Sequence, residues 1–471
     1  MSSSNIWLMS WGLIAVLVVV FLTLSTRRVI AIGALIVLIP FQVVETRYAS
    51  SSVLMAYAIA GLLLINGGLR LRMVPALTLV VFAYLMSLSQ ADQFLTMHVI
   101  EIFQFVSCLV VFLLAYNYAK LVREDRVVMD TLIMINALAV LYCALQLSAG
   151  PGNAFVPFGI DSLAFNSNRN PSDPRLIGPF DNPGTTAGFF TLMTLVCAVE
   201  LMFASRGRRL LLQALIIANV GGILATGNRA SFLVLLAAFP AILVLFRREL
   251  GARRVTQYFI GGVAALAIAS AVIITYSDFG NMFRRLQSVT ETEDGMPTTR
   301  AGTWSMAIEK IEREPWFGEG PHYFNSEDAE MLGLLRARHE ELGEIRTLFD
   351  PFPHSMYLYL LRTVGIVGLC AVMWFFGQAW LETYAALRRH ESNAYRQAML
   401  KLGLVLIGAF LVSQITLEFN RPGTMDYAQF IFSLMGLFVG IADRGLAAEH
   451  AATSKLPAGE LPAHAHAARR S

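Results

Sequence analysis

The stretch MHVIEIFQFVSCLVVFLLAYNY, residues 97–118, decides the fold class of this chain. It contains one carboxylate, Glu101, and no lysine or arginine. A helix of about 20 mostly apolar residues is long enough to cross the hydrocarbon core of a bilayer. The stretch therefore predicts a helix that spans a membrane.

Similar apolar runs recur along the whole chain. Of its 471 residues, 56% are hydrophobic and 15% are charged, and its mean hydropathy is +0.58. Soluble domains are less apolar and more charged. We predict an all-α polytopic membrane protein with about 12–14 transmembrane helices. The runs lie near residues 6–24, 29–44, 52–68, 74–88, 97–118, 127–148, 183–204, 210–226, 230–246, 257–275, 355–381, 397–417 and 426–442.

Short clusters of arginine and lysine follow alternate runs. Loops rich in these residues stay in the cytoplasm, so the pattern predicts a cytoplasmic C-terminus and an outer N-terminus. The first run, near residues 6–24, is too long for the core of a signal peptide, so we expect it to be retained. The clusters are Arg27/Arg28, Arg70/Arg72, Lys120/Arg123/Arg126, Arg206/Arg208/Arg209, Arg247/Arg248/Arg253/Arg254 and Arg388/Arg389.

Two long segments are thereby assigned to the outer face. In the second, the stretch TTRAGTWSMAIEKIE at residues 298–312 has apolar residues at helical spacing, and Pro315 follows it. A further helix is predicted at residues 326–346. The expected parts are transmembrane helices at 1–148, the first outer segment at 149–182, central transmembrane helices at 183–275, a large outer loop with short helices at 276–353, C-terminal transmembrane helices at 354–442 and a disordered cytoplasmic tail at 443–471.

Three arginines lie at predicted helix starts or turns on the outer face. Arg229 follows Asn228 where one run ends and the next begins, and Arg300 opens the first loop helix. Arg175 precedes a Gly/Pro turn and a helix start near Asn182. A single arginine at a helix end often only reaches for lipid headgroups. Because helix N-termini favour anions, the three together indicate a polyanionic substrate such as a lipid diphosphate.

A histidine lies at the mouth of a predicted spanning helix. In DPFPHSMYLYLLRTVGIVG, residues 350–368, His354 stands between two prolines and an apolar run. An isolated histidine before a helix is often a cap or a surface residue, but a neutral imidazole here can also act as a general base. Glu101 and Gln104 share one helix face, which indicates either a hydrogen bond between helices or a second functional site.

Metal, redox and nucleic-acid chemistry are not indicated. The sequence has no HExxH and no DxD motif, and its four cysteines all fall inside apolar runs, where we expect small buried hydrophobic residues. A net charge of +3, spread over short clusters, does not indicate binding to nucleic acid. We expect no metal ion and no cofactor.

Four stretches resemble the superfamily of O-antigen ligases and Wzy-type polysaccharide polymerases, and they occur in the order found in that superfamily. At three positions this chain differs from the pattern: Gly184 and Ser355 replace asparagines, and Asn228 replaces a serine. The stretches are RLIGPFDNPGTTAG at 175–188, ATGNRASFLVL at 225–235, TTRAGTWSMAIEKIEREPWFGEGPHYF at 298–324 and PHSMYLYLLRTVGIVGL at 353–369.

The resemblance implies a metal-independent, inverting glycosyltransferase of the GT-C type in the bacterial inner membrane. It would take a glycan from undecaprenyl diphosphate at the periplasmic face. Arg229 and Arg300 would hold the diphosphate, and His354 would activate the acceptor hydroxyl. The further substrate-binding residues would be Arg175, Asn182, Asn228, Trp304 and Tyr357.

Several functions stay open at this point. A polymerase of exopolysaccharide or O-antigen is favoured slightly by the long outer loop and the replaced asparagines, and a chain-length regulator and a flippase would be its partners. A ligase that uses lipid A core as acceptor is the alternative, and a protein O-oligosaccharyltransferase comes third. A transporter of lipid-linked sugars is disfavoured, because its charged residues would lie at the middle of the membrane.

Overall fold

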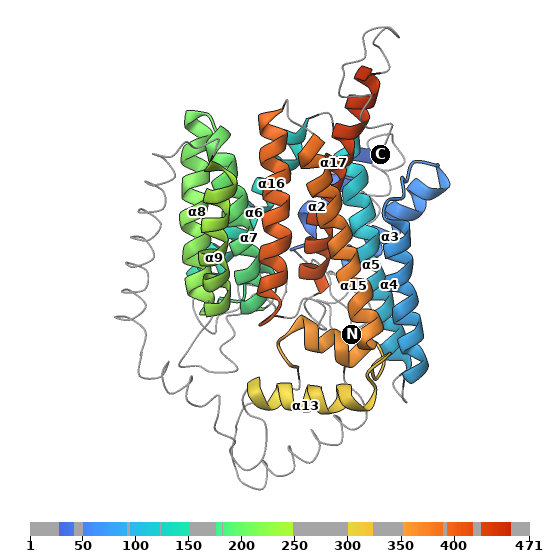
Figure 1. The fold of residues 1–471 in the computed structure, drawn as a ribbon. Coiled ribbons are helices and arrows are strands. Elements are labelled where there is room, and N and C mark those ends of the chain that lie inside the picture. The colour runs from blue at the N-terminus through green and yellow to red at the C-terminus, as the bar shows by residue number, and fades with distance from the viewer. Residues whose placement is uncertain are drawn as a thin grey trace, which may run out of the picture.

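The computed structural model shows a bundle of helices (Figure 1). It describes residues 28–41, 50–91, 95–122, 124–149, 176–180, 182–247, 300–323, 352–389, 393–417 and 425–453. Within these ranges all regular elements are helices, which confirms the predicted all-α membrane class.

Eleven of the predicted runs correspond to helices of the described part, and the runs near 6–24 and 257–275 lie outside it. Seven helices there are long and apolar enough to span a membrane: α5 (Leu95–Leu121), α6 (Asp125–Ala149), α7 (Pro183–Phe203), α8 (Arg206–Thr226), α15 (Met356–Arg389), α16 (Ala394–Ser413) and α17 (Met425–Thr453). Shorter apolar helices are α2 (Arg28–Leu38), α3 (Ser51–Ile65), α4 (Val74–Ser87) and α9 (Arg229–Leu245). The polar loop helix is α13 (Arg300–Arg313), and η1 (Leu88–Gln90) and η3 (Gly178–Phe180) are single 3₁₀ turns.

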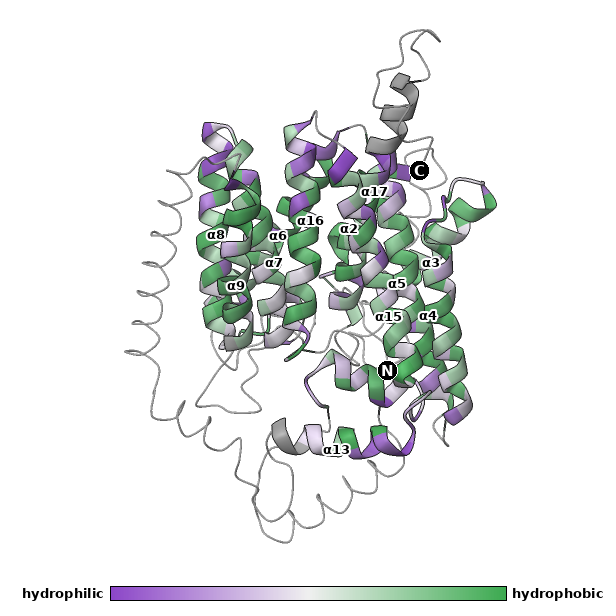
Figure 2. Cartoon of the chain, viewed as in Figure 1, coloured by the Kyte–Doolittle hydropathy of each residue, from purple (hydrophilic) through white to green (hydrophobic). Residues whose placement is uncertain are grey.

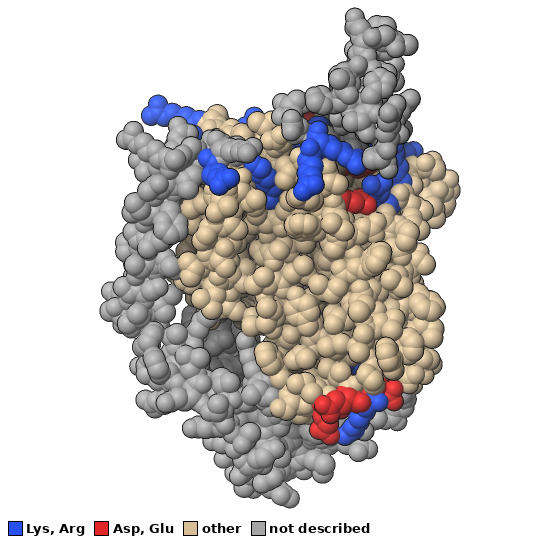
Figure 3. All heavy atoms as spheres, in the orientation of Figure 1, with Lys and Arg blue, Asp and Glu red and all other residues tan. Residues whose placement is uncertain are grey.

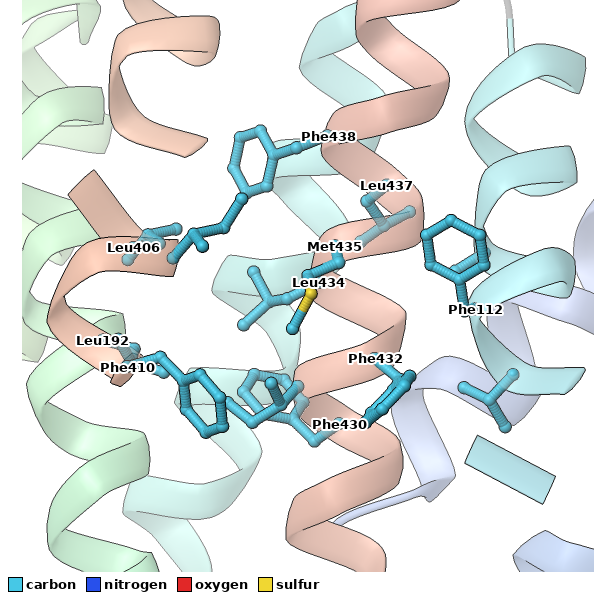
Figure 4. Packing of buried hydrophobic residues seen from close by; sticks show 14 of the residues in the cluster. Phe112, Leu192, Leu406, Phe410, Phe430, Phe432, Leu434, Met435, Leu437 and Phe438 are labelled. Carbon is cyan, nitrogen blue, oxygen red and sulfur yellow. The ribbon is translucent and has the colours of Figure 1, made fainter. Parts of the chain in front are cut away.

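Helix α17 forms the centre of the bundle. All its residues from 425 to 442 are buried, and its phenylalanines and leucines pack against α5, α7 and α16 (Figure 4). Gly436 and Gly440 lie against α5, where an added Cβ at Gly436 would come within 2.2 Å of the Phe112 carbonyl oxygen. Small residues at this spacing let two helices approach closely in a membrane.

Charged residues are sorted between the two ends of the bundle. The middle is apolar (Figure 2), and lysine and arginine gather at the end opposite α13 (Figure 3). Ion pairs tie helices together at that end, among them Lys120 with Asp443 at 2.7 Å and Arg396 with Asp125 at 2.8 Å. This arrangement agrees with the alternating arginine and lysine clusters of the sequence.

The end that carries α13 contains a broken helix. Gly365 has non-helical backbone angles, φ 67° and ψ −170°, inside α15. The turn after α13 docks on the break, because Glu319 N–H donates to Arg362 O at 2.8 Å and Ile366 N–H donates to Pro315 O at 2.9 Å. Backbone groups freed by a break in a spanning helix need such protein partners, since lipid offers none.

We expect Gly365→Ala to destabilise the protein strongly. A Cβ at this position would lie 2.2 Å from the Trp316 carbonyl oxygen. The backbone region that Gly365 occupies is open almost only to glycine and costs other residues about 1–3 kcal/mol, apart from the clash. Thermal unfolding in detergent should show a lower midpoint. Gly377→Ala is the matched control, because Gly377 is also in α15 and an added Cβ meets nothing within 4 Å; equal midpoints for the two variants would contradict the prediction.

Of two boundaries drawn from the sequence, the structure moves one, at residue 443, and keeps the other, at the end of the first loop helix. Helix α17 continues to Thr453, so the boundary predicted at residue 443 lies inside a helix. The residues there are rich in alanine, which favours helix. The loop helix expected over residues 298–312 is α13, and Pro315 follows its end as predicted. The second loop helix, expected at 326–346, lies outside the described residues.

Candidate functional site

Helices α7 and α9 begin next to each other, and each begins with an asparagine cap. Asn182 Oδ1 accepts hydrogen bonds from Gly184 N–H at 2.8 Å and Thr185 N–H at 3.3 Å. Asn228 Oδ1 accepts one from Ser231 N–H at 3.0 Å. A Cβ at Gly184 would lie 3.1 Å from Asn182 Oδ1 and 3.3 Å from Asn228 Nδ2. Both cap side chains therefore lie beside Gly184. Two positive helix ends therefore converge here.

Gly184 is small for a steric reason. An added Cβ would come within 2.8 Å of Leu417 Cδ2. The asparagine that the superfamily often has at this position would require the Leu417 side chain and the two cap side chains to move. Gly184, which differs from the family pattern, thus lies where α7 packs against the residues that follow α16.

The start of α15 is attached to the same region. Met356 N–H donates to both Gln414 O at 3.0 Å and Leu417 O at 2.9 Å. Leu417 also lies beside Gly184, so this one residue links the start of α15 to the region of the two asparagine caps. His354 lies two residues before α15. That its side chain faces the caps stays a prediction.

His354 has an uncommon backbone conformation. Its φ is 49°, and among the described residues the other non-glycine residue with positive φ is Met73. This left-handed conformation costs a non-glycine residue about 1–2 kcal/mol, and such strain is found preferentially at functional sites. His354 is half-buried. The residue before it is fixed by Trp304, whose indole N–H donates to Pro353 O at 2.6 Å.

Trp304 and Tyr357, predicted to bind substrate, use their polar atoms inside the protein. Trp304 has one N–H donor, and Pro353 O accepts it. The Tyr357 hydroxyl donates to Leu411 O at 2.8 Å. Both residues thus fasten the backbone around His354. Contact between their rings and a substrate stays a prediction.

The structure places the backbones of two of the three predicted arginines. Arg229 is the first residue of α9, directly after the Asn228 cap, and so begins at the converging helix ends. Arg300 is the first residue of α13, which Trp304 ties to the residue before His354. Arg175 lies outside the described residues.

A buried ionic group at the break of α15 was not predicted. Arg362 is 1% exposed, and its Nε donates to Glu319 Oε2 at 3.1 Å. Lys310 Nζ lies 3.6 Å from the same oxygen, and the Arg362 guanidinium lies 3.9 Å above the Tyr323 ring. The signal in the sequence was an arginine inside an apolar run, which is costly in a membrane unless it is paired.

Glu101 and the histidines near it form a second polar group. The Tyr359 hydroxyl donates to Glu101 Oε1 at 3.3 Å, and His322 Nδ1 lies 3.8 Å from Glu101 Oε2. His98 Nδ1 accepts the backbone N–H of His322 at 3.0 Å. Glu101 thus connects α5 to α15 and to the turn after α13, and it makes the hydrogen bond between helices that was one of the two alternatives drawn from the sequence.

The family model described as O-antigen ligase matches residues 214–373. These residues are therefore similar to the O-antigen ligase family. The ligase-family region runs from α8 into α15 and includes Asn228, Arg229, α13 and His354. The resemblance seen in the sequence is thereby confirmed. Asn182 and Arg175 precede the matched region. A comparison of the chain with curated proteins finds no match.

Proposed function

We propose that this membrane protein is a glycosyltransferase that transfers a glycan from undecaprenyl diphosphate to a saccharide acceptor, at the periplasmic face of a bacterial inner membrane. The observation that carries the proposal is the meeting of two asparagine-capped helix starts beside Leu417, whose carbonyl oxygen accepts the N–H of Met356, two residues after the strained His354. Arg229 begins one of these helices, and all but the cap of α7 lie in the ligase-family region.

The donor would be held through its diphosphate. Negative charge develops on the diphosphate as the bond to the sugar breaks, and preorganised cations and N–H dipoles stabilise it. Arg229 is suited to this role because it sits at the start of α9, beside the start of α7. Arg300 would approach from α13, and Arg175 would assist from the first outer segment.

The acceptor would be activated by His354. The imidazole takes the proton of an acceptor hydroxyl, the hydroxyl oxygen forms a bond to the anomeric carbon, and undecaprenyl diphosphate leaves from the opposite side with the electron pair of the broken bond. This single displacement inverts the configuration at the anomeric carbon. Within the described ranges no group of three or more His, Cys, Asp or Glu is arranged to hold a metal ion.

Polymerisation of a surface polysaccharide, exopolysaccharide or O-antigen, is the activity we favour. The long outer loop at residues 276–353 and the replacement of the asparagines of the superfamily pattern by Gly184 and Ser355 support it over transfer to lipid A core. A flippase and a chain-length regulator would then be partners. A transporter of lipid-linked sugars is the alternative of another class, but Arg229 and Arg300 begin helices rather than lying within them.

The purified protein should make product without a metal ion. The donor is the lipid-linked glycan extracted from cells that lack this protein, offered together with either more of the same glycan or lipid A core. We expect longer glycan chains in the first mixture and an unchanged rate in EDTA. Product only with lipid A core would assign a ligase instead, and loss of activity in EDTA would contradict the metal-free mechanism.

A further inference from the structure

The two sides of the proposed reaction depend on separate elements. Arg300 begins α13, and His354 lies two residues before α15. Figure 1 shows α13 lying across the end of the bundle, outside the packed spanning helices. Something must therefore hold α13 in a fixed position relative to α15 if both residues are to act on one substrate molecule.

One carboxylate connects these elements. Glu319, in the turn after α13, lies 3.1 Å from Arg362 Nε of α15 and 3.6 Å from Lys310 Nζ of α13. The side chain of Arg362 is 1% exposed, that of Lys310 7% and that of Glu319 16%. Bulk water screens such a group little, so each charge depends on the others.

The backbone around Glu319 supports the same connection. Glu319 N–H donates to Arg362 O at 2.8 Å, and Gly320 N–H donates to Thr363 O at 3.2 Å. The Arg362 guanidinium also covers the ring of Tyr323, which stacks on Phe352 at 4.8 Å between centroids. Phe352 lies two residues before His354. The ionic group is thus continuous with the segment that carries the proposed base.

We propose that Lys310, Glu319 and Arg362 form a positioning clamp that fixes α13 against α15, and so aligns Arg300 with His354. The proposal rests on the proposed glycosyl transfer for its effect on rate. Without the Glu319 charge, two buried cations face each other and repel, and α13 loses its register on α15. The clamp residues touch no substrate, and they act through the helices that they join.

The kinetic test compares Glu319→Gln with the wild-type protein, using lipid-linked glycan from cells that lack the protein. Small displacements of reacting groups cost up to about 10²-fold in rate, so we expect kcat to fall about 10- to 100-fold while KM for the donor changes less than about twofold. Glu319→Asp, which keeps the charge, should recover at least half of kcat. An Asp variant as slow as the Gln variant would contradict the clamp.

Glu309→Gln is the matched control for these measurements. Glu309 lies on α13 and forms an exposed ion pair with Arg313 at 2.7 Å. Exposed pairs of this kind contribute little, so its kcat should equal that of the wild-type protein. If Glu319→Gln behaves like this control, the proposal is wrong.

A second measurement follows the position of α13 directly. Cys370 of α15 is exposed, although the sequence indicated a buried residue, while the three other cysteines are buried. Spin labels on Cys370 and on Glu312→Cys of α13, which is an exposed position, report the distance between the helices by electron paramagnetic resonance. We expect one narrow distance distribution, which Glu319→Gln broadens and Glu309→Gln leaves unchanged.

This readout separates the clamp from the proposed function. Narrow distributions in both variants would overturn the clamp even if kcat falls. A broadened distribution in Glu319→Gln supports the clamp independently of the assay. Full product from Arg229→Ala and His354→Ala would instead reject the proposed function, with the distance result still valid.

Discussion

Replacing His354 by alanine is expected to lower the rate of glycan transfer by about 10²- to 10⁴-fold, the usual contribution of a positioned general base. His354 is held at φ 49° between Pro353, whose oxygen accepts the Trp304 indole N–H, and the start of α15. The assay uses purified protein with extracted lipid-linked glycan. Immunoblotting of membranes should show normal amounts of the variant.

His354→Asn distinguishes chemistry from backbone conformation. Asparagine adopts the left-handed region more readily than alanine does, so it preserves the bend but offers no base. We expect the asparagine variant to be as inactive as the alanine variant. If the asparagine variant retains wild-type rates, His354 serves as a bend before α15, and the proposed base is elsewhere.

Arg229→Ala should reduce kcat by about 10²- to 10³-fold, equivalent to about 2.7–4 kcal/mol of lost stabilisation of the leaving group. Arg229 begins α9 directly after the Asn228 cap, where the starts of α7 and α9 meet. Arg229→Lys should recover part of the rate, because a lysine keeps the charge but cannot bind two phosphate oxygens with a planar fork.

Arg206→Ala is the control for this variant. Arg206 is likewise the first residue of a helix, α8, but it is exposed and belongs to the arginine cluster that the sequence assigns to the cytoplasm. Transfer should proceed at the wild-type rate in this variant. Equal losses in Arg206→Ala and Arg229→Ala would mean that arginines at helix starts matter for membrane insertion here and not for the diphosphate.

Parts of the candidate site were predictable because they are local. A helix cap is a matter of a few consecutive residues, so Asn182 and Asn228 could be recognised at the helix starts where the structure places them. The loop helix with Trp304 was visible in its apolar spacing. The role of Trp304 could not be predicted, because its hydrogen-bond partner is the backbone oxygen of Pro353, 49 residues along the chain.

The buried ionic group shows the opposite case. Arg362 falls inside an apolar run, and its partner Glu319 lies 43 residues away in a loop. The break at Gly365 also leaves no local mark, since glycine occurs in spanning helices for several reasons. Only the docked turn after α13, with its backbone hydrogen bonds to residues 362–367, explains both.

The sequence by itself determined that the chain is an all-α membrane protein, where its apolar helices lie, and that it resembles the O-antigen ligase family. Transfer of a helix into a bilayer depends on the summed hydropathy of consecutive residues, which any window of the sequence contains. The tertiary structure alone decided that the starts of α7 and α9 meet beside Leu417 and the start of α15, and that Glu319 joins Lys310 to Arg362. These arrangements depend on side-chain volume and charge pairing between segments far apart in the chain, and no local pattern contains them.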